Sequence, residues 1–187
     1  MVSGTYFSFT YVTYAFPPEL GEEASGALFL SSAGKHYGMV SRGAYCLCIT
    51  VDKDIDVEVG ALGMTVFPRG PYVYIGSALN GLEARILRHV ETSRGLRKVT
   101  RWHVDYLLRE PEVHIESVYI RITDERVECT LAREVSSRGE PVRGFGCNDC
   151  RCTSHLFRVR RFGFLPELGL ERWPLDNRET YEGCFGS

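Results

Sequence analysis

The sequence predicts an α+β fold in which short strands pack beside about three helices in a single domain. Two observations point to this class. Runs of β-forming residues bounded by glycines or polar residues cover residues 43–51 and 72–76, which favours strands. Beyond residue 79, apolar side chains recur at spacings of three and four, which is one face of a helix. A chain of 187 residues is long enough for one well-buried core and short for two, so one core is expected.

The N-terminal part of the chain carries no clear pattern. Residues 1–41 mix aromatic, proline and glycine residues, and we expect them to form a poorly organised extension. The first strand is predicted at residues 43–51. Apolar and acidic residues then alternate over residues 55–60, glycines and a proline mark turns up to residue 70, and residues 72–76 form the next strand.

Three helices and two further strands are expected in the rest of the domain. The helices fit residues 79–95, 102–109 and 125–137, each of which ends at or just before a glycine or a proline. Residues 113–122 alternate as a strand, and a cysteine-rich turn leads into a last strand at residues 155–159.

These elements predict three regions in the chain. The extension covers residues 1–41, the folded domain covers residues 42–160, and a loosely held tail covers residues 161–187, which are rich in glycine, proline and acids.

Composition limits the class of protein. The chain is 44% hydrophobic and 25% charged, which is typical of a soluble globular protein. It has no run near the roughly 18 apolar residues of a membrane span. The first residues lack the basic and apolar pattern of a secretory signal. We therefore expect a cytoplasmic protein without a membrane partner, whose seven cysteines are reduced or bind metal.

Charge is unevenly distributed along the chain. The net charge is −2 overall, −2 in residues 1–41 and −3 in residues 162–187, which leaves +3 for residues 42–161. Two arginine-rich segments, residues 83–101 and 138–161, each have a net charge of +4. Such segments fit attraction to a phosphate backbone, although solvated surface explains charge runs as well. A nucleic acid, DNA in particular, is the expected partner.

Two short motifs lie on two of the predicted strands. They read Gly43-Ala44-Tyr45 and Tyr74-Ile75-Gly76, and the helix after the second carries Arg85 and His89 one turn apart. This arrangement resembles the GIY-YIG nuclease superfamily and departs from it only at Ala44. More closely, residues 43–158 resemble an uncharacterised branch of that superfamily, classed as a domain of unknown function. The signatures of that branch appear here as Tyr74-Ile75-Gly76-Ser77-Ala78, Arg88-His89, Trp102-His103-Val104-Asp105-Tyr106, Glu128-Cys129 and Gly146-Cys147-Asn148-Asp149-Cys150-Arg151-Cys152-Thr153-Ser154-His155-Leu156.

The resemblance implies a small mixed β-sheet flanked by three helices, and hydrolysis of DNA phosphodiesters with one divalent cation, Mg²⁺ or Mn²⁺. It makes Tyr45 and Tyr74 the strand tyrosines that, with a metal-bound water, generate the nucleophile. Arg85 would steady the phosphate, and Glu128 would hold the metal. His89 stands four residues after the arginine, where relatives place another hydroxyl or imidazole. A hard cation suits this set because it prefers oxygen ligands and keeps most of its waters.

The position of Glu128 on its helix gives a second reason, independent of the resemblance, to consider it a metal ligand. On a helix it shares a face with Leu131, Ala132 and Val135, so its carboxylate sits at the end of an apolar stripe. A buried carboxylate needs a cation or hydrogen-bond partners. The ordinary alternative is an acid that the helix dipole favours near the N-terminus.

Arg85 and His89 lie on the shoulder of the buried face of their helix, from which side chains can reach a cleft. A solvated helix edge is the alternative, and we prefer it for Arg88, which falls elsewhere on the helical wheel. The two tyrosines can also be ordinary strand residues with large apolar rings. Candidates of second rank are Ser77, His103, Asp105, Asp149 and His155. Asp105 is suited to orient a histidine or to contact a metal-bound water, although a helix that packs through Trp102, Tyr106 and Leu107 is equally expected.

The cysteine-rich turn has the ligand types of a zinc site. Cys147, Cys150, Cys152 and His155 would form a Cys₃His set, although four ligands within nine residues make a compact knuckle. Two alternatives stay open: buried core thiols, and an active-site role for Asp149, Cys150 or His155.

Three functions are consistent with these observations. The first is a metal-dependent nuclease acting on DNA. The second is a nucleic-acid-binding module of the same fold that does not hydrolyse, which Ser77 favours because some active relatives have lysine after the second motif. The third is a zinc-stabilised interaction domain.

Overall fold

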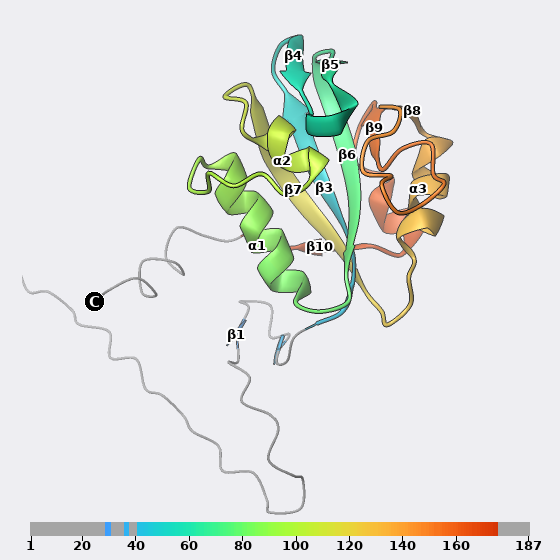
Figure 1. The fold of residues 1–187 in the computed structure, drawn as a ribbon. Coiled ribbons are helices and arrows are strands. Elements are labelled where there is room, and N and C mark those ends of the chain that lie inside the picture. The colour runs from blue at the N-terminus through green and yellow to red at the C-terminus, as the bar shows by residue number, and fades with distance from the viewer. Residues whose placement is uncertain (1–28, 31–35, 38–40, 176–187) are drawn as a thin grey trace, which may run out of the picture.

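The computed structural model describes residues 29–30, 36–37 and 41–175, and a six-stranded sheet forms its centre (Figure 1). The strand order is β10-β7-β3-β6-β9-β8. Together with the helices on its faces, this sheet confirms the predicted α+β class. The strands are β3 (Gly43–Val51), β6 (Gly70–Ala78), β7 (Val113–Ile122), β8 (Gly139–Pro141), β9 (Leu156–Val159) and β10 (Glu171–Trp173).

Every pairing within this sheet is antiparallel, whereas the expected sheet was mixed. β6 and β7 run in the same direction, but β3 lies between them and pairs with both, so no parallel ladder forms. The long pairing of β3 with β6 places Tyr45 opposite Gly76 and Gly43 opposite Ala78. The two sequence motifs are therefore cross-strand neighbours.

Helices cover both faces of the sheet, with α1 and α2 on one face and α3 on the other (Figure 1). Their bounds differ from the predicted ones by a few residues: α1 (Leu82–Ser93), α2 (His103–Leu108) and α3 (Glu128–Ser136). Side chains of β3 alternate between the two cores. Tyr45 and Leu47 lie in the core under α1 and α2, whereas Cys46 and Cys48 lie in the core under α3. Burial on both faces explains why residues 43–51 are an almost uninterrupted run of β-forming residues.

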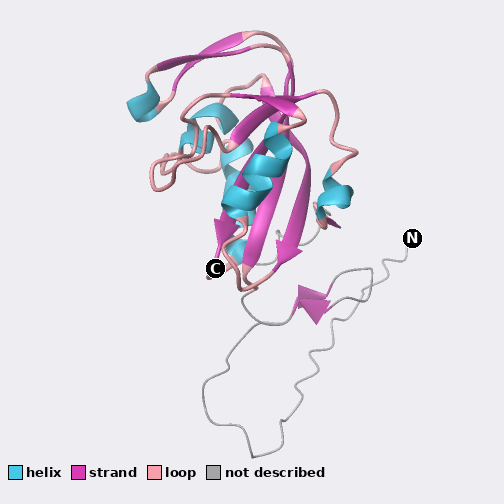
Figure 2. Ribbon diagram, turned by 90° about the vertical axis from the view of Figure 1, so that its right-hand side faces the viewer, coloured by secondary structure: helices cyan, strands magenta, loops and turns pink. Residues whose placement is uncertain are grey.

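A two-stranded arm projects from one end of the sheet, with a short helix at its tip (Figure 2). It consists of β4 (Ile55–Glu58), η1 (Gly60–Leu62) and β5 (Met64–Phe67). Only turns were expected between residues 60 and 70. Because β5 is short, lies between Gly63 and Pro68 and buries only Phe67, it leaves little pattern in the sequence.

Residues 161–175 are part of the fold, although a tail was expected from residue 161. They form η2 (Leu165–Leu168) and β10, and β10 pairs with β7 in the main sheet. Leu165 and Leu170 are buried in the core under α3. The glycines and prolines of this stretch therefore separate short elements.

Little of the expected N-terminal extension falls within the described residues. β1 (Phe29–Leu30) and β2 (His36–Tyr37) pair with each other in antiparallel fashion. In the part of the chain that the structure describes, no helix has the length and apolar character needed to cross a membrane.

Candidate active site

A polar cleft with a volume of about 360 Å³ lies between the β3–β6 strand pair, the helices and the loop before β9. Its lining includes four of the five residues predicted to act directly, namely Tyr45, Tyr74, Arg85 and Glu128. The other lining residues are Gly76, Ser77, Arg101, Trp102, His103, Gly146, Asn148 and Asp149. These side chains come from separate stretches of the sequence, so the tertiary fold assembles the cleft.

The pairing of β3 with β6 places the two tyrosines. Tyr45 lies opposite Gly76, and Tyr74 is two residues back along β6 on the same face. The Tyr45 ring lies across Gly76, where a Cβ would come within 2.4 Å of the ring Cζ and the hydroxyl. The centroids of the two tyrosine rings are 6.4 Å apart. Residue 76 is therefore a glycine because the Tyr45 ring leaves no room there for a side chain.

Tyr45, His89 and Asp105 form a buried chain behind the cleft. The Tyr45 hydroxyl lies 2.9 Å from Nε2 of His89, and Nδ1 of that ring lies 3.4 Å from Oδ1 of Asp105. An ionised carboxylate only accepts hydrogen bonds, so we expect the imidazole proton on Nδ1 and the Tyr45 hydroxyl as the donor to Nε2. Burial lowers the pKa of His89, which favours this neutral form. His89 therefore supports Tyr45 from behind and does not line the cleft.

Both tyrosines are protonated at neutral pH. Burial, and next the neighbouring Tyr74, raise the pKa of Tyr45 well above its usual value. Burial, and next the charge of Glu128, raise the pKa of Tyr74 as well. A phenol in this state donates hydrogen bonds, and Tyr45 has a proton acceptor directly behind it in His89.

Asp105 is fully buried and holds several groups in place. Its Oδ2 accepts hydrogen bonds from Nη2 of Arg88 at 3.1 Å and from the backbone N–H of Arg101 at 2.8 Å. Burial alone would raise the pKa of Asp105, but the nearby His89 ring and hydrogen bonds from the backbone of Arg101 and Trp102 hold it below its usual value. Arg88 was expected on a solvated helix edge. That expectation was wrong, because the Arg88 side chain turns toward this carboxylate.

Three arginine guanidinium groups lie against the ring of Trp102. The guanidinium carbons of Arg88, Arg85 and Arg101 lie 4.1, 4.4 and 5.4 Å from a Trp102 ring centroid. Cations at these distances from an indole ring are attracted to its face. Arg85 and Arg101 also line the cleft, so two guanidinium groups are held at its wall. Arg101 was not predicted, because a single arginine just before a helix carries no distinctive pattern.

Glu128 faces the cleft from the first turn of α3, where two hydrogen bonds hold it. Oγ of Ser77 donates to Oε2 at 2.5 Å, and Nδ1 of His155 lies 2.7 Å from Oε1. Burial alone would raise the pKa of Glu128, but the bonds from His155 and Ser77 and the charge of Arg85 hold it below its usual value. An ionised carboxylate therefore shares one cleft with Tyr45 and Arg85.

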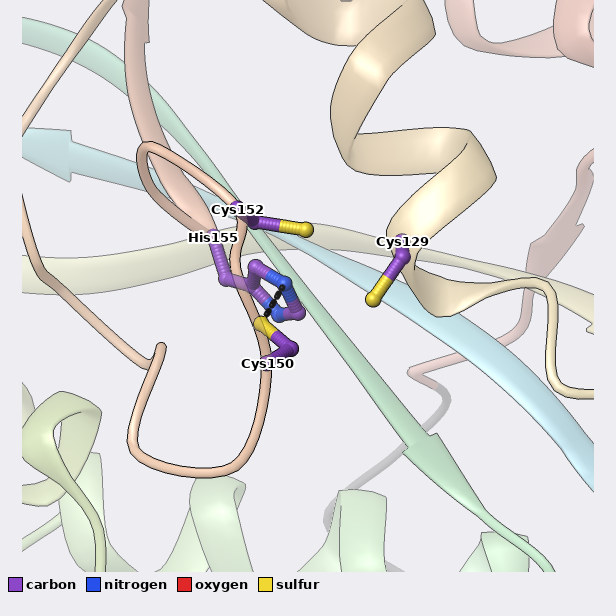
Figure 3. Close-up of side chains that lie close together, drawn as sticks. All are labelled: Cys129, Cys150, Cys152 and His155. Atoms are coloured by element: carbon purple, nitrogen blue, oxygen red, sulfur yellow. Dashed lines mark hydrogen bonds between the residues drawn. The ribbon is translucent and has the colours of Figure 1, made fainter.

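Three cysteines gather around the other ring nitrogen of His155 (Figure 3). Cys129 comes from α3, and Cys150 and Cys152 come from the loop before β9. One ligand atom from each of these four residues lies within 4.8 Å of the others, and Nε2 of His155 is 3.4 Å from Sγ of Cys150. This Cys₃His cluster could hold a metal ion such as zinc.

The predicted zinc set contained Cys147, and the cluster has Cys129 in its place. Sγ of Cys147 donates a hydrogen bond to the Phe145 carbonyl at 3.4 Å. Cys147 is not part of the set whose ligand atoms lie within 4.8 Å of one another. The four residues therefore come from two segments of the chain, α3 and the loop before β9, whereas the predicted set lay within a single stretch of nine residues. The Glu128-Cys129 signature was the sequence signal that could have identified this ligand.

The other second-rank candidates also have defined places. His103 and Asp149 line the cleft, and Nδ1 of His103 accepts a hydrogen bond from the backbone N–H of Gly146 at 3.1 Å. Burial lowers the pKa of His103, so it remains a neutral acceptor. His155 is buried between Glu128 and Cys150 and does not line the cleft.

Comparison with family models matches residues 44–167, about two thirds of the chain, to the domain of unknown function DUF123. None of the curated proteins and none of the solved structures searched matches the chain. The matched segment contains every residue of the cleft and of the cysteine cluster.

Proposed function

The chain belongs to the DUF123 family, and we propose that it hydrolyses phosphodiester bonds of DNA with a divalent cation, Mg²⁺ or Mn²⁺, as GIY-YIG nucleases do. One observation carries the proposal. Tyr45, Tyr74, Arg85 and Glu128 line the same cleft of about 360 Å³. Hydroxyl donors, a guanidinium and an ionised carboxylate are the groups that bind a phosphodiester and a hard cation together.

Glu128 is suited to hold the cation. Each of its carboxylate oxygens accepts one hydrogen bond, from Ser77 or from His155, which leaves lone pairs on both oxygens. Asp149 is a second carboxylate on the cleft lining. A bound divalent cation lowers the pKa of water and offsets the negative charge of the phosphate.

Arg85 and Arg101 are suited to bind the phosphate. Both line the cleft, and both guanidinium groups lie against Trp102. Arginine binds phosphate with two parallel hydrogen bonds, and stacking on an aromatic ring reduces the side-chain freedom lost on binding. Tyr74 adds a neutral hydroxyl that can donate to a phosphate oxygen.

Tyr45 can transfer a proton because His89 lies behind it. As water forms its bond to phosphorus, its proton would pass to the Tyr45 oxygen, while the Tyr45 hydroxyl proton passes to Nε2 of His89. The imidazolium that forms faces the Asp105 carboxylate, 3.4 Å away. The bond from phosphorus to the leaving sugar oxygen breaks, and that oxygen takes a proton from solvent. Because proton gain and loss are simultaneous, the raised pKa of Tyr45 is no obstacle.

DNA binding without hydrolysis is a second candidate, favoured by the contacts of Glu128. Ser77 and His155 engage both of its oxygens, so the carboxylate is compensated without a cation. Ser77 also stands where some active relatives have lysine.

Cleavage of branched, nicked and plain duplexes tests the proposal. With Mg²⁺ or Mn²⁺ we expect cleavage by the wild type and none by Glu128→Gln or Arg85→Ala. Tyr72→Phe is the control, because Tyr72 lies on the same face of β6 but donates to Pro68 outside the cleft. Equal cleavage by the wild type and Glu128→Gln would contradict the assignment. Salt-sensitive binding without cleavage would select the binding module, and absence of DNA binding would favour the interaction domain.

A further inference from the structure

We propose that Cys129, Cys150, Cys152 and His155 bind one zinc ion as a closed structural site, with Glu128 as the carboxylate that orients His155. This site is separate from the cation of the cleft and does not depend on the proposed hydrolysis. It ties α3 to the loop that forms one wall of the cleft.

The spacing of the ligand atoms suits a tetrahedral ion. Zinc lies about 2.3 Å from thiolate sulfur and about 2.0 Å from imidazole nitrogen, so ligand atoms on a tetrahedron are about 3.5–3.8 Å apart. The four ligand atoms here all lie within 4.8 Å of one another, and Sγ of Cys150 is already 3.4 Å from Nε2 of His155. Small rotations of the cysteine side chains would bring the set to the zinc geometry (Figure 3).

His155 is prepared for this role by its other ring nitrogen. Nδ1 lies 2.7 Å from the ionised Glu128 carboxylate, which can only accept, so the imidazole proton is on Nδ1. When the ring carries only this proton, the lone pair of Nε2 points into the cysteine cluster. A ligating histidine that donates its other N–H to a carboxylate is the common arrangement around protein zinc.

The donor set also selects the class of metal. Three thiol sulfurs and one imidazole favour zinc over magnesium or manganese, which prefer oxygen ligands. Four protein ligands complete a tetrahedron and leave no open position, which is typical of a structural site. The cleft, with its two carboxylates, hydroxyls and arginines, has no thiol on its lining and would hold a different ion.

The site explains how the loop of residues 142–155 keeps its shape. The loop contains no helix or strand between β8 and β9, yet Gly146, Asn148 and Asp149 within it line the cleft. Cys150 and Cys152 lie in this loop, and Cys129 follows Glu128 at the start of α3. Zinc would therefore connect the loop to the helix that carries the cleft carboxylate.

A nucleophilic cysteine is the main competing interpretation, because Cys150, His155 and Glu128 also lie in the order of a catalytic triad. Burial alone would raise the pKa of Cys150, but hydrogen bonds from Cys152 and the neighbouring His155 lower it. Two further thiols beside Cys150 are unexplained by such a triad, whereas a Cys₃His zinc site uses all of them.

Metal analysis of the full chain, purified under reducing conditions without a histidine tag, tests the site. We expect one zinc per chain in the wild type and less than a tenth of that in Cys129→Ser and Cys152→Ser. Cys147→Ser is the matched control, because this cysteine lies on the same loop outside the cluster, and it should keep its zinc. Absence of zinc from the wild type, or equal loss in Cys147→Ser and Cys129→Ser, would overturn the proposal.

Cobalt substitution keeps the test decisive if a cysteine variant fails to fold. Wild-type protein loaded with Co²⁺ alone should show the visible bands of tetrahedral cobalt and sulfur-to-cobalt charge transfer, and Cys147→Ser should match it. An octahedral cobalt spectrum, or rapid alkylation of Cys150 alone in wild type supplied with zinc, would contradict the zinc site, and the second result would indicate the nucleophilic cysteine.

Discussion

The ring of Tyr45 lies across Gly76, its partner in the neighbouring strand, so closely that a Cβ on residue 76 would come within 2.4 Å of the ring. The two short sequence motifs are therefore one packed unit. Because Gly76 has no side chain, the Tyr45 ring can lie across it. In this position the Tyr45 hydroxyl reaches Nε2 of His89.

Gly76→Ala should destabilise the protein by about 1–3 kcal/mol, because the added methyl group forces the Tyr45 ring to move in a packed core. Urea unfolding measures the change. Gly163→Ala is the control, since no atom lies within 4 Å of a Cβ built there, and its effect should stay within about 0.5 kcal/mol. Equal effects of the two substitutions would refute the close packing.

Tyr45→Phe should reduce both stability and cleavage. It removes the donor to Nε2 of the buried His89, which costs about 1–3 kcal/mol. It also removes the proton carrier, so cleavage should fall by about 10²–10⁴-fold. Tyr72→Phe separates the two effects, because it loses only a hydrogen bond to Pro68 and should cleave normally. Normal cleavage by Tyr45→Phe would exclude its role in proton transfer.

Stability should fall as the pH drops below about 6.5, the usual pKa of histidine. Burial lowers the pKa of His89 in the folded state; Arg88 and Arg85 act in the same direction, and Asp105 opposes them. Between the folded pKa and 6.5 the unfolded chain binds the proton and the folded protein does not, so the free energy of unfolding decreases as the pH falls. Urea unfolding from pH 8 to pH 5 should show this decrease.

His89→Gln removes this titration and tests the source of the pH dependence. Its amide can still accept a hydrogen bond from the Tyr45 hydroxyl, so the variant should fold. The fall in its stability between pH 7 and pH 5 should be smaller than in the wild type. An unchanged slope would show that other groups cause the dependence.

Asp105→Asn should destabilise the protein by about 3 kcal/mol, because it leaves the largely buried Arg88 side chain without its counter-charge. It also weakens the carboxylate cap on the backbone of Arg101 and Trp102. Arg97→Ala is the comparison, since it breaks a pair with Glu91 on the surface and should cost about 0–1 kcal/mol. Thermal unfolding of both variants gives the ranking, and equal costs would contradict the buried role of Asp105.

Zinc removal should loosen the loop of residues 142–155. After treatment with a chelator and a reductant, trypsin should cleave faster at Arg143 and Arg151, which are exposed residues of this loop. Cleavage at Arg69, outside the loop, should keep its rate. Mass spectrometry of the first fragments locates the cuts. Equal acceleration at all three arginines would indicate global unfolding in place of local loosening.

Much of the fold and part of the candidate site could be predicted from the sequence. The buried strand at residues 43–51 and the helix after Gly81 can be predicted from local composition and from the spacing of apolar residues. The lining of one cleft by Tyr45, Arg85 and Glu128 agrees with their predicted grouping. The sequence predicts these features because each depends on a residue pattern within a single helix or strand, or on a motif that such an element carries.

The contacts between distant elements were decided by the tertiary structure. The choice of Cys129 over Cys147 depends on how α3 packs against the loop before β9. The inward turn of Arg88 depends on Asp105 in another helix, and β10 joins the sheet through its pairing with β7. Each of these partners lies at least seventeen residues away in sequence. Local propensity acts over a few residues, so only the packing of the whole chain sets which of these side chains meet.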